Sequence, residues 1–136
     1  IKMSHNELPN VNFATIERMQ LAAKNPNAGP VFMLNLNKYS SSADFPDGAL
    51  YKEYMQSISR LVSEVEGKIL WRTPVNGQVV GSQDIDEVLG VWYPSNAAFL
   101  NIRNSPSSAR NMELRERAVK SANLHWCDPY TVMRNP

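Results

Sequence analysis

The sequence predicts an α+β fold in which a four-stranded antiparallel sheet carries helices on one face. Three observations support this prediction. Apolar residues alternate along several short segments, as in half-buried strands. They recur at helical spacing between Leu50 and Val65, which indicates a helix with one buried stripe. The segments follow each other in the order β-α-β-β-α-β, and 136 residues are enough for one domain with its own core.

The N-terminal part is expected to precede this unit as an arm and a helix. Residues 1–11 are polar, and we expect a flexible arm there. Asn12 is a candidate N-cap for a helix over residues 13–24. We therefore divide the chain into an N-terminal arm and helix, residues 1–28, and a main domain, residues 29–136.

The first strand of the main domain is predicted over residues 31–38, and residues 39–46 are predicted to form a loop. Because side chains alternate across a strand, two sets of residues face opposite ways. We expect helices to cover the set Phe32, Leu34 and Leu36. We expect the open face of the sheet to carry the set Met33, Asn35 and Asn37.

The next helix has the clearest pattern in the chain. We expect Asp47 to be its N-cap and Gly67 to mark its end. Its buried stripe is Leu50, Tyr54, Ile58, Leu61 and Val65.

Two strands and a short hairpin are predicted to follow. A strand over residues 68–75 leads to the turn Asn76-Gly77, from which residues 78–81 return as a short strand. A further strand is predicted over residues 87–93.

A second helix and a last strand complete the order. Ser95 is predicted to cap the helix, which starts again at Ser105-Pro106 and continues to about Ala122. The last strand is predicted over residues 124–132. This order is that of the ferredoxin-like fold. We expect its open sheet face, with Asn35 and Trp92, to be covered by a second copy of the chain.

Several segments resemble a known superfamily. They are residues 29–36, Tyr51 and Tyr54, Tyr93-Pro94-Ser95 with Ala98-Phe99, and Ser105-Pro106. This set resembles the dimeric α/β-barrel superfamily, and most closely a bacterial family of unknown function with an Asn-Leu pair in its first strand and a Phe-Pro-Ser or Tyr-Pro-Ser turn. The resemblance covers about residues 29–132. It implies a homodimeric barrel, in a superfamily that includes cofactor-independent monooxygenases, isomerases, stress-responsive barrels and haem-handling enzymes.

Composition narrows the range of partners. The net charge is +1 and the basic residues are scattered, which argues against nucleic acid or an acidic membrane as a main partner. No apolar run approaches the roughly 20 residues that a membrane-spanning helix needs. The first residues show no apolar signal region, and a cleaved leader is left open. The single cysteine, Cys127, fits a reducing compartment, so we expect a cytoplasmic protein.

Three residues are candidates for catalysis. His125 is a candidate general base, because its pKa is ordinarily near neutral pH. Asn35 and Arg72 are candidate donors to an oxyanion. The plain alternatives are a structural role for His125, an Asn35 amide that bonds to a neighbouring strand or to the dimer partner, and a surface charge at Arg72. His125 and Cys127 share one side of the last strand, but we expect no metal site and no catalytic thiol there.

An aromatic pocket is the candidate binding site. We expect Trp92, Tyr51 and Trp71 to line it together with Asn37 and Met33. Core or interface packing is the alternative role for the aromatic side chains. Asp86 and Glu87 lie at a strand start, where carboxylates are usually solvated.

The leading hypothesis is therefore a homodimer that binds a small apolar or aromatic ligand. As an enzyme it would be a cofactor-independent oxygenase or isomerase that acts on a small aromatic, polyketide-like or lactone substrate. The second hypothesis is a ligand carrier or a stress-related interaction module without catalysis. The third is a haem-binding protein that uses His125 as the iron ligand.

Overall fold

The structure, a computed structural model, describes residues 10–133 of the chain. Within this range the chain forms the predicted ferredoxin-like α+β fold, preceded by one helix. The strands are β1 (Val31–Tyr39), β2 (Lys68–Pro74), β3 (Glu87–Tyr93) and β4 (Val119–Cys127). The α-helices are α1 (Phe13–Ala23), α2 (Ala49–Glu64), α3 (Asn96–Leu100) and α4 (Ser108–Ala118). Two short 3₁₀ helices, η1 (Ser41–Ala43) and η2 (Asn101–Asn104), complete the described elements.

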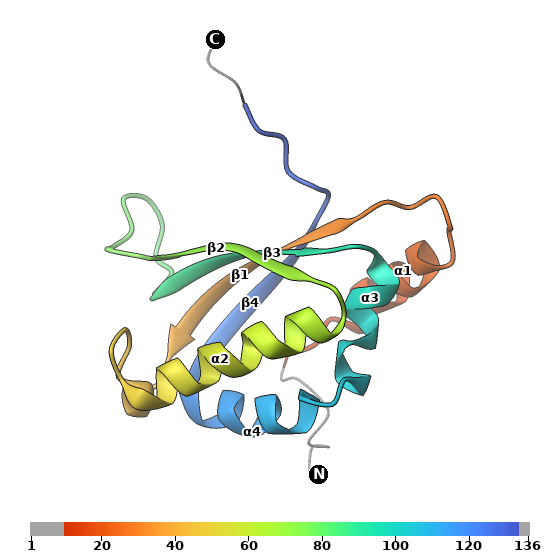
Figure 1. Ribbon diagram of the computed structural model, residues 1–136. Coiled ribbons are helices and arrows are strands. Elements are labelled where there is room, and N and C mark those ends of the chain that lie inside the picture. Colours follow the sequence, from red (N-terminus) through yellow and green to blue (C-terminus); the bar gives the residue numbers. More distant parts are fainter. Residues whose placement is uncertain (1–9, 134–136) are drawn as a thin grey trace.

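The sheet has the strand order β2-β3-β1-β4, and every neighbouring pair is antiparallel. Figure 1 shows α2 and α4 side by side beneath the sheet, and α1 and α3 together at one end of it. No described helix covers the opposite face of the sheet. The fold is therefore two-layered, with one face of the sheet left open.

Helix α2 forms because its apolar residues recur on one face, as the sequence predicts. Tyr54, Leu61 and Val65 of the expected stripe are buried, and Leu50 and Ile58 are partly buried. This face packs against the sheet and against α4.

The N-cap of α2 is Gly48 and not Asp47. A Cβ atom at residue 48 would overlap the carbonyl oxygen of Ala43, so the close approach of η1 requires glycine there. Asn12 also makes no side-chain cap on α1. Ser95 does cap α3, since its Oγ accepts a hydrogen bond from the Ala98 N–H at 3.0 Å.

The largest differences from the predicted elements lie in the second half of the chain. Residues 78–81 form no strand, and the segment between β2 and β3 has no regular structure. The helix after Ser105-Pro106 ends at Ala118, before the expected end at Ala122. As a result β4 begins at Val119 and ends at Cys127, several residues earlier than predicted.

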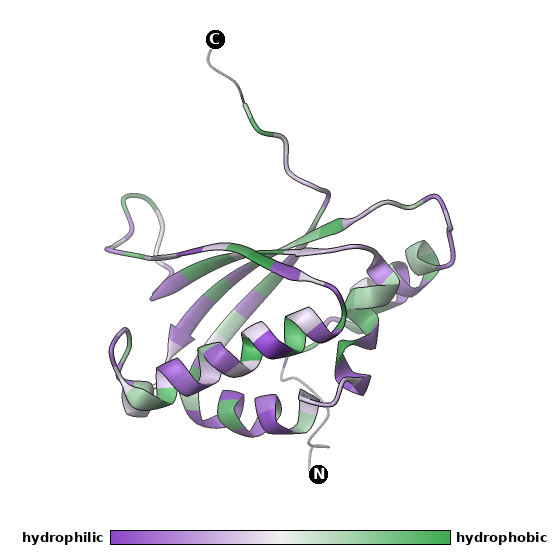
Figure 2. Cartoon of the chain, viewed as in Figure 1, coloured by the Kyte–Doolittle hydropathy of each residue, from purple (hydrophilic) through white to green (hydrophobic). Residues whose placement is uncertain are grey.

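The prediction of which face of β1 meets the helices is wrong. Met33 lies in the core beneath the helices, and Asn35 and Asn37 share its side of the strand. Phe32 pairs with Trp92, so the set Phe32, Leu34 and Leu36 lies with Trp92 on the open face. The error has a physical cause, because β1 is a central strand with apolar residues on both faces. Figure 2 shows hydrophobic residues along the strands of the sheet rather than on the helix layer alone.

Candidate ligand-binding site

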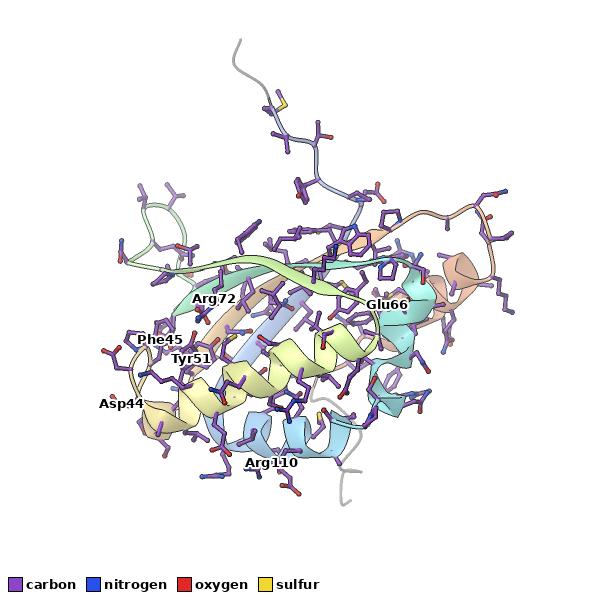
Figure 3. All side chains as sticks on the ribbon, viewed as in Figure 1. Asp44, Phe45, Tyr51, Glu66, Arg72 and Arg110 are labelled. Carbon is purple, nitrogen blue, oxygen red and sulfur yellow. The ribbon has the colours of Figure 1, made fainter. Side chains whose placement is uncertain are left out.

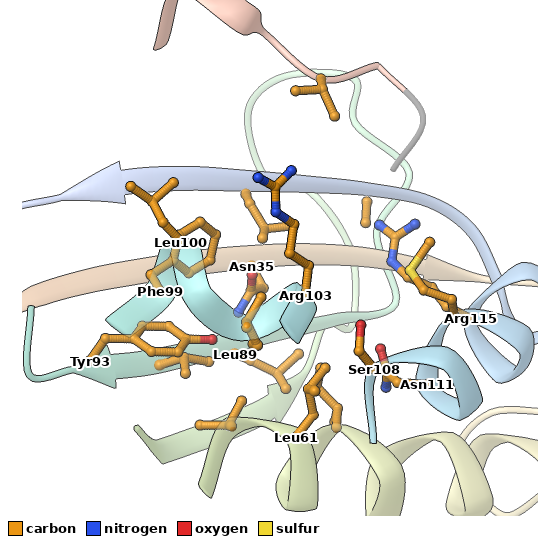
Figure 4. A pocket seen from close by; sticks show the side chains of 18 of the residues that line it. Asn35, Leu61, Leu89, Tyr93, Phe99, Leu100, Arg103, Ser108, Asn111 and Arg115 are labelled. Atoms are coloured by element: carbon orange, nitrogen blue, oxygen red, sulfur yellow. The ribbon is translucent and has the colours of Figure 1, made fainter. Parts of the chain in front are cut away.

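A cavity of about 630 Å³ lies between the helix-facing side of the sheet and the helix layer. Its walls are mainly apolar and come from β3, α2 and α3, including Leu61, Val62, Leu89, Val91, Phe99 and Leu100 (Figure 4). Ligand pockets in proteins commonly have this size and this mixture of apolar walls with a few polar groups.

The sheet side of the cavity carries two amides of β1, Asn35 and Asn37, and Asn35 lies among apolar neighbours. Asn35 lies opposite Leu89 on β3 and Leu124 on β4, so its side chain stands between two leucines. It lines the cavity and makes no hydrogen bond with another side chain of residues 10–133. A polar group in an apolar wall is costly to desolvate without a partner. Asn35 is therefore available to a molecule in the cavity.

The helix side of the cavity carries most of its polar groups. Ser108, Asn111 and Arg115 recur at helical spacing on α4 and so face the same way. Arg103, a residue of η2, lines the same cavity. Asn111 is held in place by its Nδ2, which donates to the Oγ of Ser57 at 3.2 Å.

Two tyrosines line the cavity as neutral groups. Burial raises the pKa of Tyr93 above its ordinary value of 10.0. Burial also raises the pKa of Tyr54, and the nearby Arg115 only partly opposes this effect. Both hydroxyl groups are therefore protonated at neutral pH.

Helix α1 closes one side of the cavity. Phe13, Ile16 and Gln20 of this helix line it. The helix is held by its packing against α3 and by Arg18, whose guanidinium lies 5.5 Å from the centre of the Trp126 ring. The extra N-terminal helix thus contributes directly to the candidate site.

A buried carboxylate cluster lies at the other end of the sheet, near the start of α2. Glu87, only 1% exposed, accepts a hydrogen bond from the Tyr39 hydroxyl at 2.6 Å. The Tyr51 hydroxyl lies 2.8 and 2.9 Å from its two oxygens. Arg72 donates to the Tyr51 oxygen at 2.5 Å, and Figure 3 labels both side chains. The Nη1 of Arg72 is 3.5 Å from Glu87.

This cluster joins four elements of the fold, including β2 through Arg72. It connects β3 through Glu87, β1 through Tyr39 and α2 through Tyr51. Burial and then the hydrogen bond to Glu87 raise the pKa of both tyrosines. Asn37 links the cluster to the cavity, because it lines the cavity and its Nδ2 donates to the Tyr39 oxygen at 3.2 Å. The expectation that Glu87 would be solvated is wrong, since its partners come from distant parts of the sequence.

The three residues expected to act together are not brought together. Asn35 lines the cavity and Arg72 lies in the carboxylate cluster. His125 pairs with Leu34 of β1, so it lies on the open face of the sheet and is exposed. The sheet itself separates His125 from the other two residues.

The residues expected to bind ligand are divided in the same way. Asn37 lines the cavity, Met33 lies in the core and Tyr51 belongs to the carboxylate cluster. Trp71 and Trp92 lie on the open face, where Trp92 pairs with Phe32 and Trp71 pairs with Gly90.

Sequence reasoning missed the polar groups of the helix layer. Arg103, Ser108, Asn111 and Arg115 line the cavity, although no motif marks them. A usable signal exists on α4, where polar residues share the face of the buried Leu114. Polar groups on the inner face of a helix indicate a solvent-filled or ligand-filled space.

Residues 10–133 contain no group of three or more His, Cys, Asp or Glu side chains placed to hold a metal ion. None of the helices in this range combines the length and the apolar character needed to cross a membrane.

Comparisons with known proteins identify the class of fold. No protein-family model matches the sequence, and no curated protein matches it. A solved structure of a protein of unknown function from Rhodopseudomonas palustris is similar, with a TM-score of 0.72, 23% identity, and coverage of 90% of this chain and 97% of that one.

Two more distant solved structures share the fold. The protein At3g17210 from Arabidopsis thaliana is similar with a TM-score of 0.59 and 12% identity over 76% of this chain and 99% of that one. A dabb family protein with a ferredoxin-like fold from Mesorhizobium loti has a TM-score of 0.53 at 12% identity, with the same coverage of both chains. At these identities the similarity establishes the ferredoxin-like fold and nothing about chemistry.

Proposed function

We propose that this protein binds a small, mainly apolar molecule in the cavity between its sheet and its helices. The observation that carries the proposal is the cavity itself, about 630 Å³ with apolar walls and a few polar groups at fixed positions. Asn35 supports it further, because a ligand would give this amide a hydrogen-bond partner.

Binding without catalysis is the better supported form of this function. The described residues that line the cavity include no Asp, Glu, His, Lys or Cys, and burial raises the pKa of its two tyrosines, Tyr54 and Tyr93, so neither is a base at neutral pH. General acid–base catalysis ordinarily uses such groups within hydrogen-bond reach of the substrate. His125, on which the oxygenase, isomerase and haem hypotheses depend, lies on the other face of the sheet. A carrier or sensor of a small molecule therefore accounts for the site with fewer assumptions.

Binding of the neutral fluorescent probe N-phenyl-1-naphthylamine tests this proposal. Its emission is expected to rise saturably, because it leaves water for an apolar site. Ala122→Phe adds bulk where Ala122 lines the cavity, and is expected to abolish the rise. Ser121→Phe is the matched control, since Ser121 is exposed on the opposite side of the same strand. No saturable rise, or equal loss in both variants, contradicts the proposal.

We also propose that the open face of the sheet contacts a second copy of the chain. This face carries the half-buried Leu34, Leu36 and Trp92 beside Trp71, which is 43% exposed. Apolar surface of this kind on a sheet is commonly covered by another subunit. Leu34→Asp places a charge at the centre of the face and is expected to convert a dimer into a monomer in analytical ultracentrifugation. A wild-type protein that sediments as a monomer at all concentrations contradicts this proposal.

A further inference from the structure

The charged residues that line the cavity are all basic. Arg103 from η2 and Arg115 from α4 both line the cavity, and no described lining residue carries a carboxylate. The charge is local, because the whole chain has a net charge of only +1. A cavity with two guanidinium groups and no acid favours an anionic guest.

Neither arginine is neutralised by a described carboxylate. Two other described arginines are paired with carboxylates, since Arg72 lies 3.5 Å from Glu87 and Arg110 lies 2.6 Å from Glu53. Within residues 10–133, Arg103 and Arg115 form no ion pair of this kind. Arg115 also has the Tyr54 hydroxyl as a neutral hydrogen-bond partner, which leaves its charge uncompensated. The fork-shaped guanidinium of each arginine can therefore still pair with the two oxygens of a carboxylate.

The charged groups of the cavity lie apart from its apolar walls. Figure 4 shows the guanidinium groups of Arg103 and Arg115 pointing to the same side, away from Leu61. Leu61 and Leu89 belong to the apolar walls formed by α2 and the sheet. A molecule with one anionic end and an apolar body matches this division.

Resting on the proposed function, we propose that the ligand is an amphipathic carboxylic acid, aliphatic or aromatic, whose carboxylate is bound by Arg103 and Arg115. Its apolar body lies against Leu61, Leu89 and Phe99. A carboxylate fits better than a phosphate monoester, because a single charge is less costly to take from water into a mainly apolar cavity.

Calorimetric titrations with matched acid and alcohol pairs test this inference. The probes are decanoate with decan-1-ol, and 2-naphthoate with 2-naphthylmethanol. At least one acid is expected to bind about tenfold or more tightly than its alcohol, because a hydrogen bond to a charged group contributes more than one between neutral groups. Added salt is expected to weaken binding of the acid and not of the alcohol.

Single-residue variants test whether Arg103 and Arg115 bind the carboxylate. Arg103→Gln and Arg115→Gln are each expected to weaken binding of the acid by about tenfold and to leave the alcohol unchanged. Arg117→Gln is the matched control, since it removes the same charge from an exposed position of α4 outside the cavity. Arg103 is exposed, so Arg103→Gln is expected to fold normally. It keeps the test valid if Arg115→Gln fails to fold.

The outcomes separate the two proposals. Equal affinity for acid and alcohol, or unchanged affinity of the acid in Arg103→Gln, overturns the carboxylate inference and leaves binding of an apolar molecule standing. No binding of any of the four probes overturns the proposed function and the carboxylate inference with it.

Discussion

Replacing Glu87 by alanine is expected to destabilise the fold strongly. The carboxylate accepts a hydrogen bond from Tyr39 at 2.6 Å and another from Tyr51 at 2.8 Å. A hydrogen bond to a charged group contributes roughly 1.5–3 kcal/mol, so loss of the two would cost about 3–6 kcal/mol. Removal of a buried charge offsets part of this loss, because its desolvation cost also disappears. Arg72 adds little, since its side chain is 49% exposed and its charge is screened by water.

The net expectation is a decrease of about 3–5 kcal/mol in the free energy of unfolding. Urea denaturation followed by circular dichroism measures it directly. For a chain of this size the melting temperature should fall by roughly 10–20 °C. Glu116→Ala is the control, because it removes an exposed carboxylate from α4 and should change stability by less than about 0.5 kcal/mol.

A second variant distinguishes the charge from the hydrogen bonds. Glu87→Gln keeps one acceptor oxygen and the shape of the side chain, so it should cost clearly less than the alanine variant. A loss below about 1 kcal/mol for Glu87→Ala would refute the view that this carboxylate holds α2 and β1 to β3.

Three further predictions concern stability. Because burial raises the pKa of Tyr93, the folded state keeps a proton that the unfolded state releases near pH 10.0. The free energy of unfolding should therefore be unaffected by this group at lower pH and should fall above about pH 10. In urea denaturation, Tyr93→Phe should reduce the slope of this fall by about 1.4 kcal/mol per pH unit. Identical slopes for the variant and the wild type would contradict this prediction. Ser95→Ala removes the cap of α3 and should cost about 1 kcal/mol in the same assay, whereas no loss would show that the cap is dispensable. Gly90→Ala places a Cβ against the rings of Trp71 and Phe32 and should cost about 1–3 kcal/mol, with a shift in tryptophan fluorescence; an unchanged spectrum would show that the two rings do not pack there.

The parts of the fold that could be predicted depend on local signals. The stripe on α2 needs only the helical period, and the Ser95 cap needs only the residues that follow it. The element order then leads to the sheet topology, because few arrangements satisfy it. The start of β4 at Val119 escaped prediction, since Lys120 and Ser121 are polar and continue the pattern of a solvated helix.

The candidate site depends on contacts between distant residues, which a single sequence does not reveal. Alternation along β1 shows that Asn35 shares a face with Met33, but it does not say which face meets the helices. Glu87 is buried because Tyr39 and Tyr51 reach it from other elements. Arg103 lines the cavity from η2, a short 3₁₀ helix within a segment that the sequence predicts as part of one longer helix.

Nuclear Overhauser contacts between bound decanoate and the methyl groups of the protein test most directly whether a ligand occupies the space between sheet and helices. The account predicts contacts from the alkyl chain to Leu61, Leu89 and Leu100, which line the cavity. It predicts none to Leu34 and Leu36, which lie on the open face of the sheet. Contacts to these two residues in place of the first three would contradict it.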